Sequence, residues 1–234
     1  MLAVIDCRLS PSCCKALESL GFTLLSMPPF LSLAQPVASH PDMLIFPFRD
    51  RLFCHRAYYA TAKTKINTIL NASGLSLCLT DDMVSTTYPT DVRLNLVDLD
   101  GRILGKADAI SKKVKEYAAQ NQIPIVPVKQ GYTKCSSVVL KRALITADKG
   151  IAYAAQSEGA DVLLISPGGV MLPGYSHGFL GGACGIYRNT VFFCGNLDLH
   201  PEAAYIRSFC KGHGYNVVSL SEEPLLDAGT LFLF

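Results

Sequence analysis

Hydrophobic and polar positions follow one recurring order along this chain of 234 residues. In residues 92–96, apolar and polar side chains alternate as they do in a half-buried strand, and residues 98–101 (Asp-Leu-Asp-Gly) are typical of a turn. A second apolar stretch follows at 102–105. Residues 109–118 then carry apolar side chains at helical spacing after Asp108, a candidate N-cap, and 123–128 are extended again. The pattern predicts a unit of two strands, a helix and a third strand.

The same order recurs about five times, which is typical of a repeat architecture. After Asp42 it predicts a strand over 43–46 and a helix near 60–71, and comparable patterns follow residues 135 and 184. Each unit opens on an acidic or thiol residue, and these openers are Asp42, Asp91, Cys135, Cys184 and Asp227.

The fifth unit is split between the two ends of the chain. Residues 230–234 supply one strand, and the missing strand, helix and strand are predicted at 2–5, 10–21 and 22–26. An unpaired strand at 231–234 would be an exposed apolar edge, so we expect it to pair with the N-terminal strand and close a ring. The alternative is an ordinary α/β sheet whose strands and helices alternate by chance. The ring interpretation makes residues 1–234 one domain of α/β class.

Composition limits the classes of partner. Half of the residues are apolar and 17% are charged, which favours a substantial core, and a net charge of +2 gives no sign of nucleic-acid binding. No apolar run is long enough to span a membrane, and the N-terminus lacks the basic region of a signal peptide. The nine cysteines are odd in number, and several lie in apolar stretches, so we expect free thiols and a cytoplasmic protein.

Two glycine-rich phrases resemble the blade starts of a known superfamily. They are Gly181-Gly182-Ala183-Cys184-Gly185 and Leu226-Asp227-Ala228-Gly229-Thr230. Together with the five units, they resemble the pentein fold, the five-bladed α/β propeller of the guanidino-group-modifying enzymes, which include deiminases, amidinotransferases and dimethylarginine dimethylaminohydrolases. At the level of architecture the resemblance covers the whole chain. It implies a pseudo-fivefold propeller of ββαβ-like units, closed by pairing of the terminal strands, with the openers near its axis.

The chain departs from those enzymes at one important position. In the enzymes, a nucleophilic cysteine follows the glycines of the last blade, whereas Leu231 or Phe232 stands there in this chain. No cysteine follows Cys210. The resemblance therefore does not by itself assign the activity of those enzymes to this chain.

Carboxylates are the first candidates for a central site, because they can hold a planar guanidinium bidentately. Asp91 and Asp227 are the main candidates for substrate binding, and Asp42 is a further one. An aspartate before a strand also caps turns with its own side chain, so a purely structural role stays open for each.

Thiols and a histidine complete the candidate chemistry. Cys135 and Cys184 are candidate nucleophiles, and His177 is a candidate acid or base on the loop that leads to Cys184. Lys134 is expected to lower the pKa of the neighbouring Cys135 thiol. Small-residue packing for the cysteines, and a backbone hydrogen bond for His177, are the alternatives.

No cofactor or metal is predicted. The glycine stretches do not match nucleotide-binding motifs, and Cys7, Cys13 and Cys14 lack the common zinc spacings.

Two functions follow from these observations. The first is binding of a small cationic or guanidino-type molecule at the axis, with a thiol-dependent hydrolase or transferase reaction as its extension. The second is a non-catalytic interaction protein on the same scaffold, similar in role to the ribosome anti-association factor that shares the pentein fold. Substrate, turnover and oligomeric state stay open. The most informative observation is whether the candidate residues converge around one pocket, namely Asp91, Cys135, His177, Cys184 and Asp227.

Overall fold

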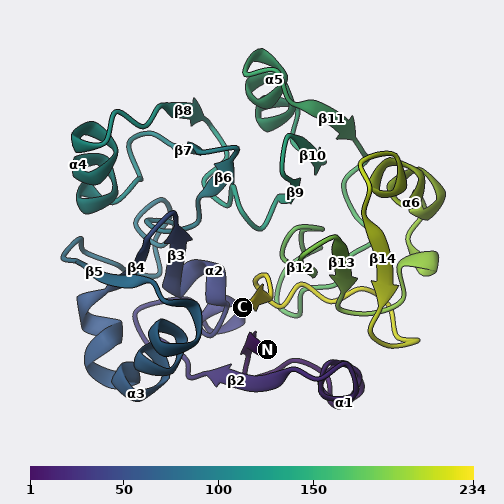
Figure 1. Ribbon diagram of the computed structural model, residues 1–234, viewed down its shortest axis with the longest axis horizontal. Helices are drawn as coiled ribbons and strands as arrows, with labels where there is room; N and C mark the ends of the chain where they lie inside the picture. The colour runs from purple at the N-terminus through teal and green to yellow at the C-terminus, as the bar shows by residue number, and fades with distance from the viewer.

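Five small sheets of three strands each surround a common centre (Figure 1) in the computed structural model, which describes residues 1–234. In every sheet the central strand pairs antiparallel with one neighbour and parallel with the other. Four sheets are consecutive in sequence: β3 (Ile45–Phe48), β4 (Arg51–His55) and β5 (Ser76–Thr80); β6 (Val97–Leu99), β7 (Arg102–Lys106) and β8 (Ile125–Val128); β9 (Ser137–Leu140), β10 (Ala143–Thr146) and β11 (Asp161–Leu164); β12 (Cys184–Tyr187), β13 (Thr190–Phe193) and β14 (Asn216–Ser219).

The fifth sheet joins the two ends of the chain. It contains β1 (Leu2–Asp6), β2 (Thr23–Met27) and β15 (Phe232–Leu233). Val4 of β1 lies opposite Phe232 of β15 in antiparallel register, so the predicted pairing of the terminal strands is confirmed. None of the five sheets is itself closed.

A helix connects the two parallel strands of each sheet. These helices are α1 (Pro11–Ser19), α3 (Arg56–Ser73), α4 (Lys112–Gln120), α5 (Lys149–Ser157) and α6 (Ala203–Gly212). Two helix starts follow directly from the sequence, because the Ser10 side chain caps α1 and the Asp148 side chain caps α5. The remaining helical segments are short: η1 (Gln35–Val37), α2 (Pro41–Leu44) and η2 (Leu197–Leu199).

Five hydrophobic clusters form the core, and each contains residues of two neighbouring sheets. One contains Val4 of β1 and Leu52 of β4, and another contains Phe53 of β4 and Ile103 of β7. A cluster with Ile5 of β1 and Phe192 of β13 joins the last of the four consecutive sheets to the sheet of the termini. Packing between sheets therefore continues around the centre.

Three predicted elements were wrong at their boundaries. Residues 92–96 form turns instead of a strand, and the strand of this unit is β6, which begins at Val97. The turns bury the side chain of Asn95 completely, which an alternating strand pattern does not anticipate. Asp42 lies in the short helix α2, so its strand begins only at Ile45, and α4 begins after Ser111 rather than Asp108.

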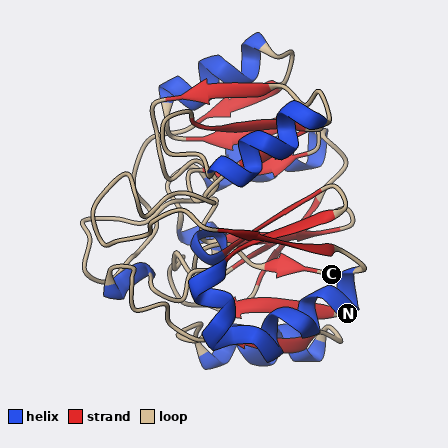
Figure 2. Ribbon diagram, turned by 90° about the vertical axis from the view of Figure 1, so that its left-hand side faces the viewer, coloured by secondary structure: helices blue, strands red, loops and turns tan.

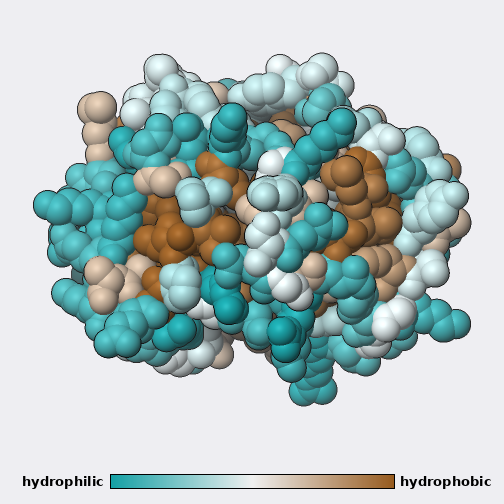
Figure 3. Space-filling view, turned by 90° about the horizontal axis from the view of Figure 1, so that it is seen from above, coloured by the Kyte–Doolittle hydropathy of each residue, from teal (hydrophilic) through white to brown (hydrophobic).

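Long loops gather on one side of the sheets, opposite the side on which both termini lie (Figure 2). The face seen in Figure 3 is mostly hydrophilic, with two separate hydrophobic areas. No helix combines the length and the apolar character that crossing a membrane requires.

Candidate functional site

The Cys135 thiol lies at the centre of a buried polar cluster. Cys135 lies two residues before the start of β9, and its Sγ donates a hydrogen bond to Oδ2 of Asp42 at 3.0 Å. The amide of Asn95 donates to the same sulfur at 3.1 Å. All three side chains are buried, so two of the predicted openers and one unforeseen amide meet in the interior.

Asp227 faces this thiol from the C-terminal segment. Its Oδ2 accepts a hydrogen bond from the backbone N–H of Phe179 at 2.9 Å, and its Oδ1 accepts one from Gly229 at 3.0 Å. Burial raises the pKa of Asp227 to about 6, with His40 opposing the shift and Asp42 adding to it. A carboxylate with a raised pKa in a cleft is a candidate for function.

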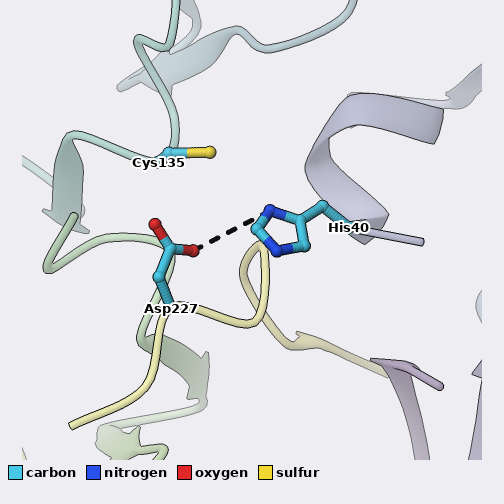
Figure 4. A group of neighbouring side chains, drawn as sticks. All are labelled: His40, Cys135 and Asp227. Carbon is cyan, nitrogen blue, oxygen red and sulfur yellow. Dashed lines mark ion pairs between the residues drawn. The ribbon is translucent and has the colours of Figure 1, made fainter. Parts of the chain in front are cut away.

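His40 lies between two carboxylates, and Figure 4 shows it facing one of them, Asp227. Its Nδ1 is 3.9 Å from Oδ1 of Asp227, and its Nε2 is 3.7 Å from Oδ2 of Asp6. The side chain is 1% exposed, and neither ring nitrogen has a hydrogen-bond partner. A buried histidine without partners needs an explanation, because unsatisfied buried polar groups are rare and costly.

Asp6 is held in its ionised form by Arg8. The Arg8 guanidinium donates to both carboxylate oxygens of Asp6, at 3.0 and 2.7 Å, and Ser39 donates to Oδ1 at 2.9 Å. Burial alone would raise the pKa of Asp6, but the Arg8 hydrogen bonds and the charges of His40 and Arg8 together lower it. Asp6 therefore provides a fixed negative charge behind His40.

A pocket of about 200 Å³ opens next to the cluster. Its wall includes an aromatic pair, Tyr132 and Phe179, whose ring centroids are 6.1 Å apart. The lining residues that carry reactive or charged groups are His40, Cys135, His177 and Asp227. The pocket thus combines an aromatic wall with a thiol, a carboxylate and two imidazoles.

The structure places two of the predicted residues at the margin of this pocket. His177 is exposed at its rim, with Nδ1 3.1 Å from the carbonyl oxygen of Gly178. Asp91 lies behind the aromatic wall, where the hydroxyl of Tyr132 donates to its Oδ2 at 2.5 Å. Burial raises the pKa of Asp91, and the Tyr132 hydrogen bond partly offsets the shift.

Two further expectations need correction. Burial raises the pKa of the Cys135 thiol well above its ordinary value, and the charges of Asp42 and Asp227 raise it further, so Lys134 does not lower it. The Lys134 ammonium instead donates to Thr230 Oγ1 at 3.3 Å and to the Ser137 carbonyl at 3.4 Å.

Cys184 does not line the pocket. Its thiol donates to the Gly181 carbonyl at 3.5 Å, it packs in the hydrophobic core, and burial raises its pKa to about 12. Its position in the fold is that of a small packing residue.

The glycine-rich phrases bring backbone close to the cluster. A Cβ atom at Gly182 would lie 2.0 Å from Oδ1 of Asp227, and one at Gly229 would lie 2.1 Å from Cβ of His40. Both positions therefore have room only for glycine, because a side chain at either would collide with Asp227 or His40.

Sequence reasoning missed His40, Asn95, Tyr132 and Thr230. The hydroxyl of Thr230 donates to Asp42 Oδ2 at 2.8 Å, and its neighbour Asp227 was already a candidate. His40 precedes Asp42 by two residues, so proximity to predicted openers was the available signal for both. Nothing in the sequence singles out Asn95 or Tyr132.

Several solved structures share this fold. Similar solved structures include DDAH from Pseudomonas aeruginosa, as a mutant complexed with citrulline, with a TM-score of 0.56 and 11% identity; the match covers 94% of this chain and 92% of that chain. A dimethylarginine dimethylaminohydrolase adduct with 4-chloro-2-hydroxymethylpyridine matches with a TM-score of 0.55 and 10% identity over the same shares of both chains. The amidinotransferase SxtG from Microseira wollei matches with a TM-score of 0.55 and 10% identity, over 89% of this chain and 72% of that chain. The chain therefore has the pentein fold, as the sequence predicted.

Within that fold, the chain belongs to a family described as a family of unknown function (DUF6873), whose profile matches residues 4–232. No curated protein matches the sequence.

Proposed function

We propose that the protein binds a small cationic or guanidino-type molecule in the pocket beside Cys135, and that the Cys135 thiol is its nucleophile. One observation carries the proposal: Cys135 is hydrogen-bonded to the Asp42 carboxylate and lines the same pocket as Asp227. Covalent catalysis needs a nucleophile next to a base. It also needs a charged group across the pocket that attracts the substrate.

The pocket suits a cation. Asp227 presents a buried carboxylate to it, and Asp91 and Asp42 lie behind its wall, each with one Oδ1 that has no hydrogen-bond partner. The aromatic faces of Tyr132 and Phe179 add an attraction for positive charge. A bound cation would also stabilise the thiolate of Cys135, whose pKa is raised in the free protein.

The proposed reaction begins at the Cys135–Asp42 hydrogen bond. The thiol proton passes to Asp42 Oδ2 while Sγ forms a bond to the guanidino carbon. The C–N bond to the leaving amine then breaks, and His177, at the pocket rim, acts as the general acid that donates the proton the amine needs. Water next attacks the carbon and returns one of its protons to His177. Its second proton is lost to solvent as the C=O double bond forms and the C–S bond breaks, and the thiolate recovers its proton from Asp42. The net reaction consumes one water and gives a ureido product and an amine.

The similar structures support the general kind of function. They include a DDAH complexed with citrulline and an amidinotransferase, which fits chemistry on guanidino groups. We also propose that the five sheets form a five-bladed propeller, since the hydrophobic clusters between neighbouring sheets continue from one sheet to the next around the centre. A reducing, cytoplasmic setting is part of the proposal, because all nine cysteines are free thiols.

The test is covalent labelling of the intact protein with a haloacetamidine, followed by peptide mass spectrometry. We expect a single modified thiol at Cys135, protection of this thiol by arginine or agmatine, and no such adduct in Cys135→Ala. Cys184→Ala is the matched control, because this thiol is equally buried but lies outside the pocket. No adduct at Cys135, together with no thermal shift from arginine, agmatine or related cations, would disprove the proposal.

A second candidate is the non-catalytic interaction protein. The observation that favours it is the lack of a thiol where the enzymes carry their cysteine. Leu231 or Phe232 stands there, and Leu231 is 2% exposed in the hydrophobic core. Co-sedimentation with ribosomes at low salt would support this role, and absence from the ribosomal fraction would contradict it.

A further inference from the structure

Three potential metal ligands from distant parts of the chain meet beside the pocket. One ligand atom each from His40, Cys135 and Asp227 lies within 4.8 Å of the others, and all three residues are buried. Figure 4 shows the imidazole and the carboxylate facing each other with the sulfur beside them. They come from the start of α2, the segment before β9 and the C-terminal segment, so no spacing motif in the sequence announces the group.

His40 is the independent sign of a ligand. It is 1% exposed, it lies among polar groups, and both ring nitrogens lack a hydrogen-bond partner. A bound cation at Nδ1 would satisfy one nitrogen, and the other already faces Asp6 Oδ2 at 3.7 Å. A carboxylate behind a ligating histidine is the usual arrangement in metal sites, because it fixes the ring and raises its basicity.

The charge balance of the cluster also favours a cation. Asp42 and Asp227 are both buried next to the thiol, whereas the Arg8 guanidinium is engaged by Asp6. The Lys134 ammonium is directed at Thr230 and a backbone carbonyl. Two buried carboxylates therefore have no direct cationic partner other than what His40 can supply.

The remaining contacts would orient the ligands. The backbone N–H groups of Phe179 and Gly229 hold the Asp227 carboxylate, and the Asn95 amide donates to the Cys135 sulfur, as a thiolate requires. Asp42 Oδ2, 3.0 Å from that sulfur, is placed to accept the proton that leaves when the thiol becomes a ligand.

We propose that His40, Cys135 and Asp227 bind one Zn²⁺-type divalent ion through Nδ1, Sγ and Oδ1, with the fourth position open to the pocket. Mixed nitrogen, sulfur and oxygen donors suit Zn²⁺, and three protein ligands with an open position are typical of its reactive sites. Bonds of about 2.0–2.3 Å in a tetrahedron bring ligand atoms roughly 3.3–3.7 Å apart. His40 Nδ1 and Asp227 Oδ1 are already 3.9 Å apart, and no pair of ligand atoms is more than 4.8 Å apart, so the side chains need to close in by at most about 1 Å on binding.

This site goes beyond the proposed function and does not depend on it. A thiol that is bound to a metal is not available as a nucleophile, so the ion and the haloacetamidine compete for Cys135. Metal binding and labelling are measured separately, and failure of one leaves the other standing.

The test uses the full chain after removal of metals with a chelator. Titration with Co²⁺, followed by absorption spectroscopy, reports thiolate ligation through a charge-transfer band, and Zn²⁺ added afterwards displaces the Co²⁺. We expect one ion per chain with this band, loss of the band in Cys135→Ser, and at least tenfold weaker binding in His40→Gln and Asp227→Asn. The controls Cys184→Ser, Cys7→Ser and His213→Gln keep wild-type binding, and circular dichroism shows which variants are folded.

Two results would overturn the site. One is the absence of a thiolate band in the wild-type protein at saturating Co²⁺. This result does not depend on the folding of any variant. The other is a band that persists in folded Cys135→Ser, because the metal would then be held by another of the nine cysteines.

Discussion

The hydroxyl of Thr230 donates a hydrogen bond to Oδ2 of Asp42 at 2.8 Å, although 188 residues separate the two in the chain. The same oxygen of Asp42 accepts a hydrogen bond from the Cys135 thiol. The last segment of the chain is thus joined directly to the polar cluster, and one carboxylate oxygen links the C-terminal turn to the candidate nucleophile.

Replacement of this hydroxyl tests the link. Thr230→Val keeps the shape of the side chain but removes a donor to Asp42 and an acceptor for Lys134. We expect the free energy of unfolding to fall by about 1–3 kcal/mol, because buried polar groups lose partners. Thr230→Ser retains the hydroxyl and should recover most of the loss in urea unfolding. Equal losses in both variants would show that the methyl group, not the hydroxyl, matters at this position.

The close approach of Gly229 to His40 leads to a second prediction. Gly229 has φ +66°, and a Cβ there would lie 2.1 Å from Cβ of His40. Gly214 has φ +80° but no atom within 4 Å of an added Cβ. Gly214→Ala should cost roughly 1–2 kcal/mol, which is the conformational penalty alone.

Gly229→Ala should cost several kcal/mol more, because the backbone around His40 has to move. Denaturant unfolding of the two variants measures the difference. If both substitutions cost the same, the contact between the Gly229 backbone and His40 is looser than the structure shows.

The sequence predicted more of the strand arrangement than of the candidate site. Apolar alternation and turn signals placed most hairpins, and the pairing of residues 230–234 with β1 followed from the need to cover an apolar edge. The strand predicted over 92–96 was wrong, because Asn95, a polar position of its alternating pattern, is buried and donates a hydrogen bond to Cys135.

The site was predicted in part. Asp42, Cys135 and Asp227 were identified because they occupy equivalent places in their units, and the structure brings them together. Cys184 occupies the equivalent place in its own unit but packs in the core. Periodicity gives positions along the chain, whereas the direction of each side chain depends on contacts between segments that are far apart in sequence.

The Asp6–Arg8 pair gives a third prediction. Asp6 is 2% exposed, so Arg8→Met would leave its carboxylate buried with fewer donors. We expect a loss of about 2–3 kcal/mol at pH 7, less than for a fully buried pair because solvent reaches Arg8. Arg56→Met is the matched control, since the Arg56–Asp81 pair is exposed on both sides and its loss should change the free energy of unfolding much less.

The pH dependence sharpens this test. The pKa of Asp6 is lowered in the folded protein, so its contribution to stability is present above its ordinary pKa of 3.8 and is lost as the pH falls further. The difference between wild type and Arg8→Met should therefore shrink in unfolding experiments at acid pH. A difference that stays constant on acidification would mean that Arg8 stabilises through packing rather than through charge.

His55 provides a fourth prediction, in a part of the core away from the pocket. Burial lowers its pKa to about 4 from an ordinary 6.5, and its Nδ1 lies 3.1 Å from Oγ1 of Thr80. Between these two pKa values the unfolded chain binds a proton that the folded chain does not, so stability rises with pH across this window. The contribution is fully present above pH 6.5 and is lost as the pH falls toward 4, with a span on the order of 3 kcal/mol. We expect urea unfolding at a series of pH values to show this slope in wild type and in Thr80→Val, which keeps the imidazole, and to show a smaller slope in His55→Gln. The same slope in wild type and His55→Gln would assign the acid sensitivity to other groups.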